Sequence, residues 1–161
     1  MHSLLLLINK VLEKLLIFIM ATIVITVTWQ VFSRFILQSP SSFTEELARF
    51  LLIWIGILGA AYAYRTKAHL GLDLFVEKMQ PVRQKVARIF IEVVVMAFAG
   101  SVMVYGGLSL VMLAVELKQT SATLGLNMGL VYSVIPISGV LILLYGLDNL
   151  IQLNSSTAVE V

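Results

Sequence analysis

The side chains of this sequence that could do chemistry are charged groups close to the ends of apolar stretches. Glu45, Glu46 and Arg49 form the densest group. In a helix, Arg49 would face Glu45 four residues earlier and Glu46 three residues earlier, which allows ion pairs on one surface. Such a cluster predicts a polar contact with a neighbouring helix or a partner subunit, and the alternative is a solvated helix end with local ion pairs.

Catalytic and cofactor chemistry has no support in the sequence. Cysteine is absent, which excludes disulfides, thiolate nucleophiles and cysteine-based metal sites. No glycine-rich phosphate loop, His-Glu-x-x-His or Gly-x-Ser-x-Gly pattern occurs. The two histidines, His2 and His69, lie at the amino end and in a polar connection. We therefore expect no enzymatic activity, no bound cofactor and no metal in this chain.

The composition indicates which kind of fold must position these groups. The chain has 161 residues, of which 60% are hydrophobic and 12% are charged, with a formal net charge of +2. Soluble domains carry about 45–50% apolar and about 25% charged residues. A mean hydropathy of +0.99 therefore indicates a protein that crosses a membrane several times. It excludes a water-exposed globular enzyme, a disordered chain and a nucleic-acid-binding protein.

Four stretches without Asp, Glu, Lys or Arg are candidate membrane spans: residues 15–33, 50–64, 93–115 and 119–147. A bilayer core of about 30 Å needs roughly 20 helical residues, so the second stretch is short. It becomes long enough if its helix begins near Thr44, with Ser42 as the cap and Glu45 completing a capping box. We expect an all-α membrane protein with four transmembrane helices, at about residues 12–37, 43–65, 88–117 and 125–149.

The distribution of Lys and Arg predicts the orientation, because these residues resist translocation across the membrane. The amino end, the central connection and the carboxyl tail together hold eight of them, and the opposite side holds three. Both termini should therefore be cytoplasmic, with residues 38–43 and 118–127 facing outward. We expect a multi-pass protein of a bacterial cytoplasmic (inner) membrane, in which the outward side is the periplasm.

The central connection, residues 66–88, is the longest polar segment. Within it, apolar residues recur at helical spacing until Pro81 ends the pattern: Leu72, Phe75, Val76 and Met79. This predicts one short amphipathic helix at about residues 71–80 that lies against lipid headgroups, and the alternative is a loop tucked against the membrane helices. Residues 1–151 should form a single membrane domain, followed by a disordered cytoplasmic tail at 152–161.

The second span has one face that suits contact with another helix. Gly56 and Ala60 fall on the same side of this helix as Arg49 and give it a small-residue surface. Trp54 falls on the opposite side and near the middle of the helix, so we expect it to face lipid or to fill a groove in a partner. The charged end and the small-residue surface together predict a helix that binds other protein segments.

The interior of each predicted span lacks ionisable side chains. A proton relay, a coupled ion site or a haem ligand requires an intramembrane carboxylate, His or Arg. None of these residue types occurs in the middle of any span. The helices therefore have no evident machinery to move a charged solute alone, and they suit a protein that holds another subunit.

An ordered set of motifs surrounds the second span: Phe32-Ser33-Arg34-Phe35, Glu45-Glu46-Leu47-Ala48-Arg49, Trp54, Gly59-Ala60-Ala61, Arg65, His69 and Asp73. This set resembles the small membrane subunit of tripartite ATP-independent periplasmic (TRAP) transporters. The resemblance covers about residues 29–75 in motif, and the layout of four spans extends it to the whole chain.

The resemblance implies a subunit that binds a much larger membrane subunit, which carries the sodium and organic-acid sites and moves as an elevator. A separate periplasmic substrate-binding protein would deliver the substrate, with the outer connections as candidates for docking it. Glu45, Glu46 and Arg49 would fix the second span against its neighbours or the large subunit. Arg65, His69 and Asp73 would secure the amphipathic segment at the headgroups or against the partner.

Two other functions stay open at this point. A self-contained small exporter acting as a homodimer would need a membrane-embedded carboxylate, and the nearest ones, Glu46 and Glu92, lie at span ends. A membrane anchor subunit of a respiratory complex would need axial histidines within the spans. Both requirements make these functions weaker hypotheses than a non-catalytic transporter subunit.

Overall fold

A computed structural model describes residues 2–39, 41–66 and 81–155 of the chain. The described part is helical and contains no β-strand; Thr120 and Asn127 form one isolated bridge. Four helices are long and apolar enough to cross a membrane, as predicted. The elements are α1 (His2–Phe35), α2 (Ser42–Arg65), α4 (Pro81–Phe98), the π-helix η1 (Ala99–Gly106), α5 (Gly107–Glu116), α6 (Met128–Tyr132) and α7 (Val134–Ser155).

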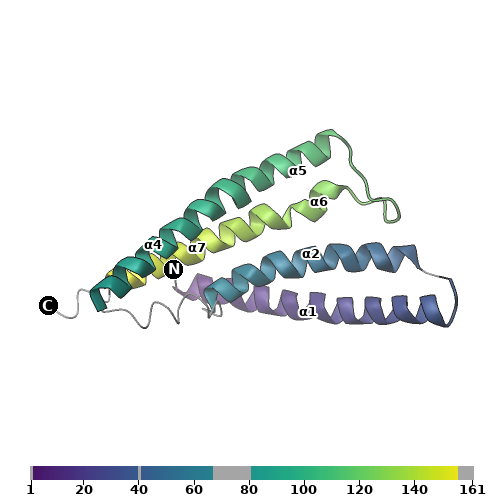
Figure 1. Cartoon of the computed structure of the whole chain (residues 1–161), viewed down its shortest axis with the longest axis horizontal. Coiled ribbons are helices and arrows are strands. Elements are labelled where there is room, and N and C mark those ends of the chain that lie inside the picture. Colours follow the sequence, from purple (N-terminus) through teal and green to yellow (C-terminus); the bar gives the residue numbers. More distant parts are fainter. Residues whose placement is uncertain (1, 40, 67–80, 156–161) are drawn as a thin grey trace.

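Helices α1 and α2 form an antiparallel pair (Figure 1). Five of the six buried residues described in α1 recur every seven positions, Leu5, Leu12, Ile19, Thr26 and Ser33, and the sixth, Ile23, lies one turn after Ile19 on the same side. A strict repeat of seven corresponds to 3.5 residues per turn, the period of a left-handed coiled coil. The narrow seam leaves the rest of α1 exposed, as a helix surrounded by lipid requires.

Helix α2 begins two residues before the expected start at Thr44. Its N-cap is Ser41 rather than Ser42, and the Ser41 hydroxyl accepts a hydrogen bond from the Thr44 N–H at 3.5 Å. Because a cap bonds the N–H three residues later, moving the cap to Ser41 lengthens the helix at its amino end. The resulting 24 residues are sufficient to span a bilayer.

The third and fourth spans are both irregular. The third runs without interruption through α4, η1 and α5, where the π-helical segment widens the helix at Ala99–Gly106. The fourth is broken at Ser133, between α6 and α7. Pro136 lacks an N–H and cannot bond the carbonyl of Tyr132, so the sequence alone predicts a kink at this level.

The helices form an open row in the order α1, α2, α6–α7 and α4–η1–α5 (Figure 1). The fourth span, made of α6 and α7, lies in the interior of this row, and 44% of its most apolar 18 residues are buried, against 11–22% for the other three spans. The two halves of the row diverge toward the connection at residues 117–127, which we call the loop end (Figure 1). The amino end of α1 and the carboxyl end of α7 lie at the other end of the molecule, away from the loop end (Figure 1).

Two apolar clusters hold the row together where α2 meets α7. The first joins α1, α2 and α7 through buried residues that include Leu12, Leu58 and Val134. The second joins α2, η1 and α7 through Ala61, Ala99 and Ile142. The small side chains in the second cluster let η1 and α7 approach closely.

Several expectations lie partly or wholly outside the described residues. These are the amphipathic helix at 71–80 and the roles of His69 and Asp73. At the carboxyl end, residues 152–155 continue α7, although they were expected to belong to an unstructured tail. Helix α7 thus continues for more than a turn beyond residue 147, where the uncharged stretch ends.

Candidate functional site

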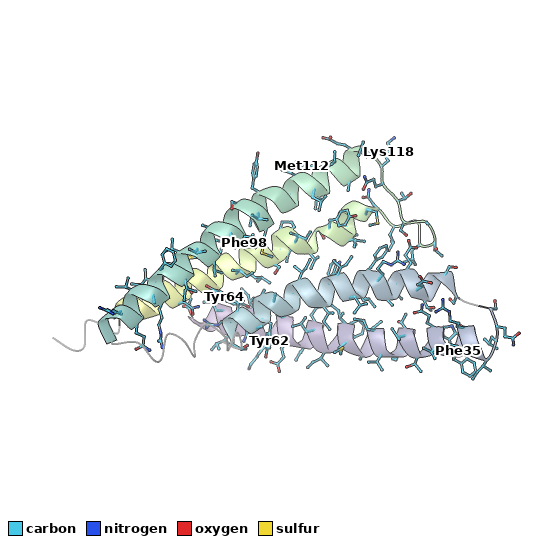
Figure 2. The ribbon with its side chains drawn as sticks, in the orientation of Figure 1. Phe35, Tyr62, Tyr64, Phe98, Met112 and Lys118 are labelled. Atoms are coloured by element: carbon cyan, nitrogen blue, oxygen red, sulfur yellow. The ribbon has the colours of Figure 1, made fainter. Side chains whose placement is uncertain are left out.

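Polar contacts join α2 to α6, α7 and the loop-end connection along most of the length of α2. We call this set of contacts the α2–α7 seam. It consists of Glu46 with the backbone of residues 122–124, Trp54 with Val131, Ser138 with Ile57, and Arg65 with Asp148. In Figure 2, Phe35 and Lys118 mark the loop end, and Tyr62 and Tyr64 mark the far end of α2.

Glu46 anchors the loop-end connection to α2. Its carboxylate accepts hydrogen bonds from the backbone N–H groups of Ala122, Thr123 and Leu124, at 3.1, 2.9 and 2.9 Å. A carboxylate that accepts several backbone N–H bonds is held more strongly than a neutral acceptor would be. The expected pairing of Glu46 with Arg49 is absent because the Glu46 side chain turns toward this loop.

Arg65 and Asp148 form a buried ion pair at the other end of the seam. The guanidinium Nη1 lies 2.8 Å from Asp148 Oδ2, and the two side chains are only 15% and 9% exposed. The guanidinium also lies over the ring of fully buried Tyr145, at 5.5 Å from its centroid. This pair ties the end of α2 to α7, whereas we expected Arg65 to hold the amphipathic segment.

Two uncharged contacts complete the seam between its charged ends. The Trp54 indole N–H donates to the carbonyl of Val131 at 3.2 Å, and the Ser138 hydroxyl donates to the carbonyl of Ile57 at 2.9 Å. Val131 lies in α6, just before the break at Ser133. Trp54 therefore packs between α2 and α6 of the same chain, whereas we expected it to face lipid or a partner.

A third side of α2, which faces neither α1 nor α7, is exposed, and we call it the open face. It carries the residues predicted to contact a partner: Glu45, Arg49, Gly56 and Ala60. Arg49 pairs with Glu45 at 3.2 Å, as the spacing predicted, and both side chains are at least half exposed. A Cβ added to Gly56 would meet no atom within 4 Å, so packing within the chain does not require glycine there.

The described residues offer no arrangement for holding a metal ion. No group of three or more His, Asp or Glu side chains converges within residues 2–39, 41–66 and 81–155. The polar groups of the seam are instead bonded to one another across helices. The seam contacts therefore fix one helix against the next.

Asp148 and Trp54 carry contacts that sequence reasoning missed. Asp148 is the only acidic residue between Glu116 and Glu160, and this stretch of the last span has no basic residue beyond Lys118. A lone carboxylate in an apolar helix needs a cation from another helix, which is a signal that could have identified its pairing with Arg65.

We expect Glu46→Gln to loosen the loop-end connection without unfolding the helices. A glutamine amide has one oxygen acceptor and cannot replace the carboxylate that bonds three N–H groups. Hydrogen–deuterium exchange at residues 122–124 should rise at least tenfold. Exchange in α7 should stay the same.

The matched control is Glu45→Gln, one position earlier on the same helix. The Glu45 side chain contacts Arg49, on the exposed face. This variant should leave exchange at 122–124 unchanged. Equal exchange in the Glu46 variant and the parent protein would show that the carboxylate does not hold the loop.

Comparisons with known proteins agree on one family. The sequence profile for the DctQ component of tripartite ATP-independent periplasmic transporters matches residues 23–155. A Haemophilus influenzae protein that carries the name TRAP transporter small permease protein is 34% identical over 88% of this chain and 86% of its own length. The sialic acid TRAP transporter small permease protein SiaQ of Vibrio cholerae is 29% identical over 62% of this chain and 57% of its own length.

A longer relative contains a region similar to this chain. The isethionate TRAP transporter permease protein DctMQ of Oleidesulfovibrio alaskensis is 29% identical over 74% of this chain, and the matched region is 20% of that protein. The similarity thus occurs both in small permeases and within a much larger permease chain.

Proposed function

Because the chain belongs to the DctQ component of TRAP transporters and is a small permease subunit, we propose that it braces the scaffold of a large permease subunit. The large subunit would move substrate across the membrane as an elevator, and this chain would enlarge the part that stays still. The small subunit itself would bind neither substrate nor coupling ion.

The observation that carries this proposal is the absence of ionisable groups from the middle of the spans. Residues 15–33, 50–64, 93–115 and 119–147 contain no Asp, Glu, Lys, Arg or His. The buried charges of Arg65 and Asp148 lie outside these stretches and bond each other. Ionisable groups within a membrane mark substrate and ion pathways, so their absence supports assigning that chemistry to another chain.

The open row of helices supports a scaffold role. A row with two long edges exposes broad helix faces, whereas a closed bundle would bury them. The α2–α7 seam keeps the row in one arrangement with charged, aromatic and hydroxyl contacts at successive levels. The open face of α2 then presents small residues at which a helix of the large subunit can approach closely.

We also propose the setting in which this subunit works. Charge distribution favours cytoplasmic termini in the bacterial inner membrane, and in this orientation the Glu46-anchored loop would face the periplasm. There the loop is available to a periplasmic substrate-binding protein. The names of relatives that act on sialic acid and isethionate support an organic acid as substrate, imported with sodium bound to the large subunit.

We expect Gly56→Leu to weaken assembly with the large permease without weakening the fold of this chain. The added side chain meets nothing within the chain but would push a partner helix away from the open face. Co-purification of the co-expressed large permease should fall at least fivefold, and Arg49→Leu should lower it in the same direction.

The thermal stability of the isolated variant controls for misfolding. Gly56→Leu should unfold within a few degrees of the parent subunit, because its site is open. Full retention of the large permease by both variants would rule out the open face as the docking surface.

A further inference from the structure

A tyrosine in the third span lies where neither water nor this chain can bond its hydroxyl. Tyr105 is 76% exposed and belongs to η1. It stands ten residues from the nearer end of the uncharged stretch 93–115, which is about 15 Å along a helix. That distance places Tyr105 close to the middle of a bilayer core of about 30 Å.

The Tyr105 hydroxyl has no hydrogen bond to any described residue; only the carbonyl of Tyr105 accepts one, from the Ser109 hydroxyl at 3.0 Å. Tyrosines in membrane proteins gather at the two interfaces, where the ring is in an apolar layer and the hydroxyl meets water. The Tyr105 side chain is too short to reach either interface from mid-span. In pure hydrocarbon, its hydroxyl would stay unsatisfied at considerable free-energy cost.

The surface around Tyr105 is shaped for another helix. The exposed hydroxyls of Ser101 and Ser109 donate to carbonyls of their own helix, at 2.6 and 3.0 Å, so they add little bulk and need no partner. Gly100 has no atom within 4 Å of an added Cβ, and Gly106 has only a backbone oxygen at 3.8 Å. Small residues of this kind let the backbones of two membrane helices come close.

The other helical glycines of the fourth span and α5 show that this openness is specific to two faces. A Cβ on Gly107, Gly129, Gly139 or Gly146 would lie 2.7–2.9 Å from a neighbour, so packing within the chain explains them. Gly100 and Gly106 have no such explanation, and neither do Gly56 and Gly59 on α2. Glycine costs about 1 kcal/mol relative to alanine in a helix, and close approach of a partner helix would be a physical reason to keep it there.

We propose that the face of the third span formed by Gly100, Ser101 and Tyr105 of η1 and Ser109 of α5 is a second docking surface for the large permease subunit. Its occupant is a transmembrane helix that carries a hydroxyl, amide or carboxyl group at mid-membrane depth and bonds the Tyr105 hydroxyl. This inference rests on the proposed association with a large permease. The row of helices would then hold its partner at two places, on α2 and on the third span, which forms one edge of the row.

Tyr105→Phe tests the hydroxyl in the co-expressed complex, because it removes one oxygen from an exposed site and leaves the ring. Loss of one interhelical hydrogen bond in a membrane should weaken association roughly three- to tenfold. Tyr132→Phe is the matched control, since Tyr132 lies in α6 near the loop end and is half-buried. The control should leave association unchanged, and an unchanged Tyr105→Phe complex would overturn the hydrogen bond.

Photocrosslinking from position 105 identifies the occupant. With p-benzoylphenylalanine at this position, irradiated membranes should give an adduct to the large permease that disappears when the large permease is not expressed. Adducts only to lipid or only to a second copy of this chain would overturn the proposal. If the parent subunit retains the large permease and these adducts are still missing, the docking surface fails while the proposed function stands.

Discussion

Asp148→Ala should destabilise the isolated subunit by about 3 kcal/mol, because it leaves the Arg65 guanidinium buried without its carboxylate. Removing one partner of a buried pair costs about 3–5 kcal/mol, since an uncompensated charge remains. The lower end applies because Arg65 lies in the last turn of α2 and can reach toward the headgroup layer. Equilibrium unfolding in mixed micelles measures this change in the free energy of unfolding.

A double variant separates the ion pair from simple packing. Arg65→Met with Asp148→Leu replaces both charges by apolar side chains, and such replacements of whole buried pairs are often neutral. It should therefore be more stable than Asp148→Ala. The exposed pair supplies the control, because Glu45→Ala should change stability by no more than about 0.5 kcal/mol. A loss below 1 kcal/mol in Asp148→Ala would show that the pair does not hold α2 to α7.

Gly139→Leu should separate α7 from η1 and prevent a stable fold, and Gly139→Ala should cost about 1–3 kcal/mol. A Cβ at this position would lie 2.8 Å from Met103 Cβ, 2.9 Å from Val104 Cγ2 and 3.2 Å from the Ala99 carbonyl oxygen. Two of these atoms are backbone or directly attached to it, so they cannot move aside as a flexible side-chain end could. The helices themselves must shift.

Gly56→Ala is the matched control for this overpacking. An added Cβ there meets no atom within 4 Å, so the alanine should leave the isolated subunit as stable as its parent or slightly more stable. Thermal unfolding in one detergent compares the two glycines directly. Equal tolerance of alanine at 56 and 139 would contradict the close contact of α7 with η1.

Local features of the sequence predicted much of the fold. Three uncharged stretches of sufficient length, and a fourth extended to a predicted helix cap, identified all four spans. The spacing of Glu45 and Arg49 predicted their pairing, because both residues lie on one helix and the distance between them depends only on helical geometry. The break at Ser133 follows from Pro136 in the same way.

The long-range contacts could not be predicted, because they depend on which helices are neighbours. Arg65 and Asp148 are 83 positions apart, and Trp54 and Val131 are 77 apart. Periodicity places each residue on a face of its own helix but does not say which helix that face meets. Because α7 lies in the interior of the row, Glu46 and Trp54 contact the fourth span and the connection before it. Arg49 and Gly56 lie on a side of α2 that no other described helix covers.

The glycines connect the fold to its proposed work. The helical glycines that packing within the chain explains lie where α6 and α7 meet their neighbours, and the helical glycines left without such an explanation lie on α2 and η1. Substitutions in the first set should therefore damage the fold, and substitutions in the second should damage assembly. A bracing subunit should show this division between the two sets of glycines, whereas a carrier that works alone should show no assembly defect.

Flux measured in liposomes tests the central claim most directly. Radiolabelled sialic acid or succinate, each with a sodium gradient and the matching periplasmic binding protein, would be offered to liposomes holding this chain alone, the large permease alone, or both. The account predicts no uptake by this chain above that of empty liposomes, and uptake only when it accompanies the large permease. Uptake by this chain alone, or full uptake by the large permease without it, would contradict the account.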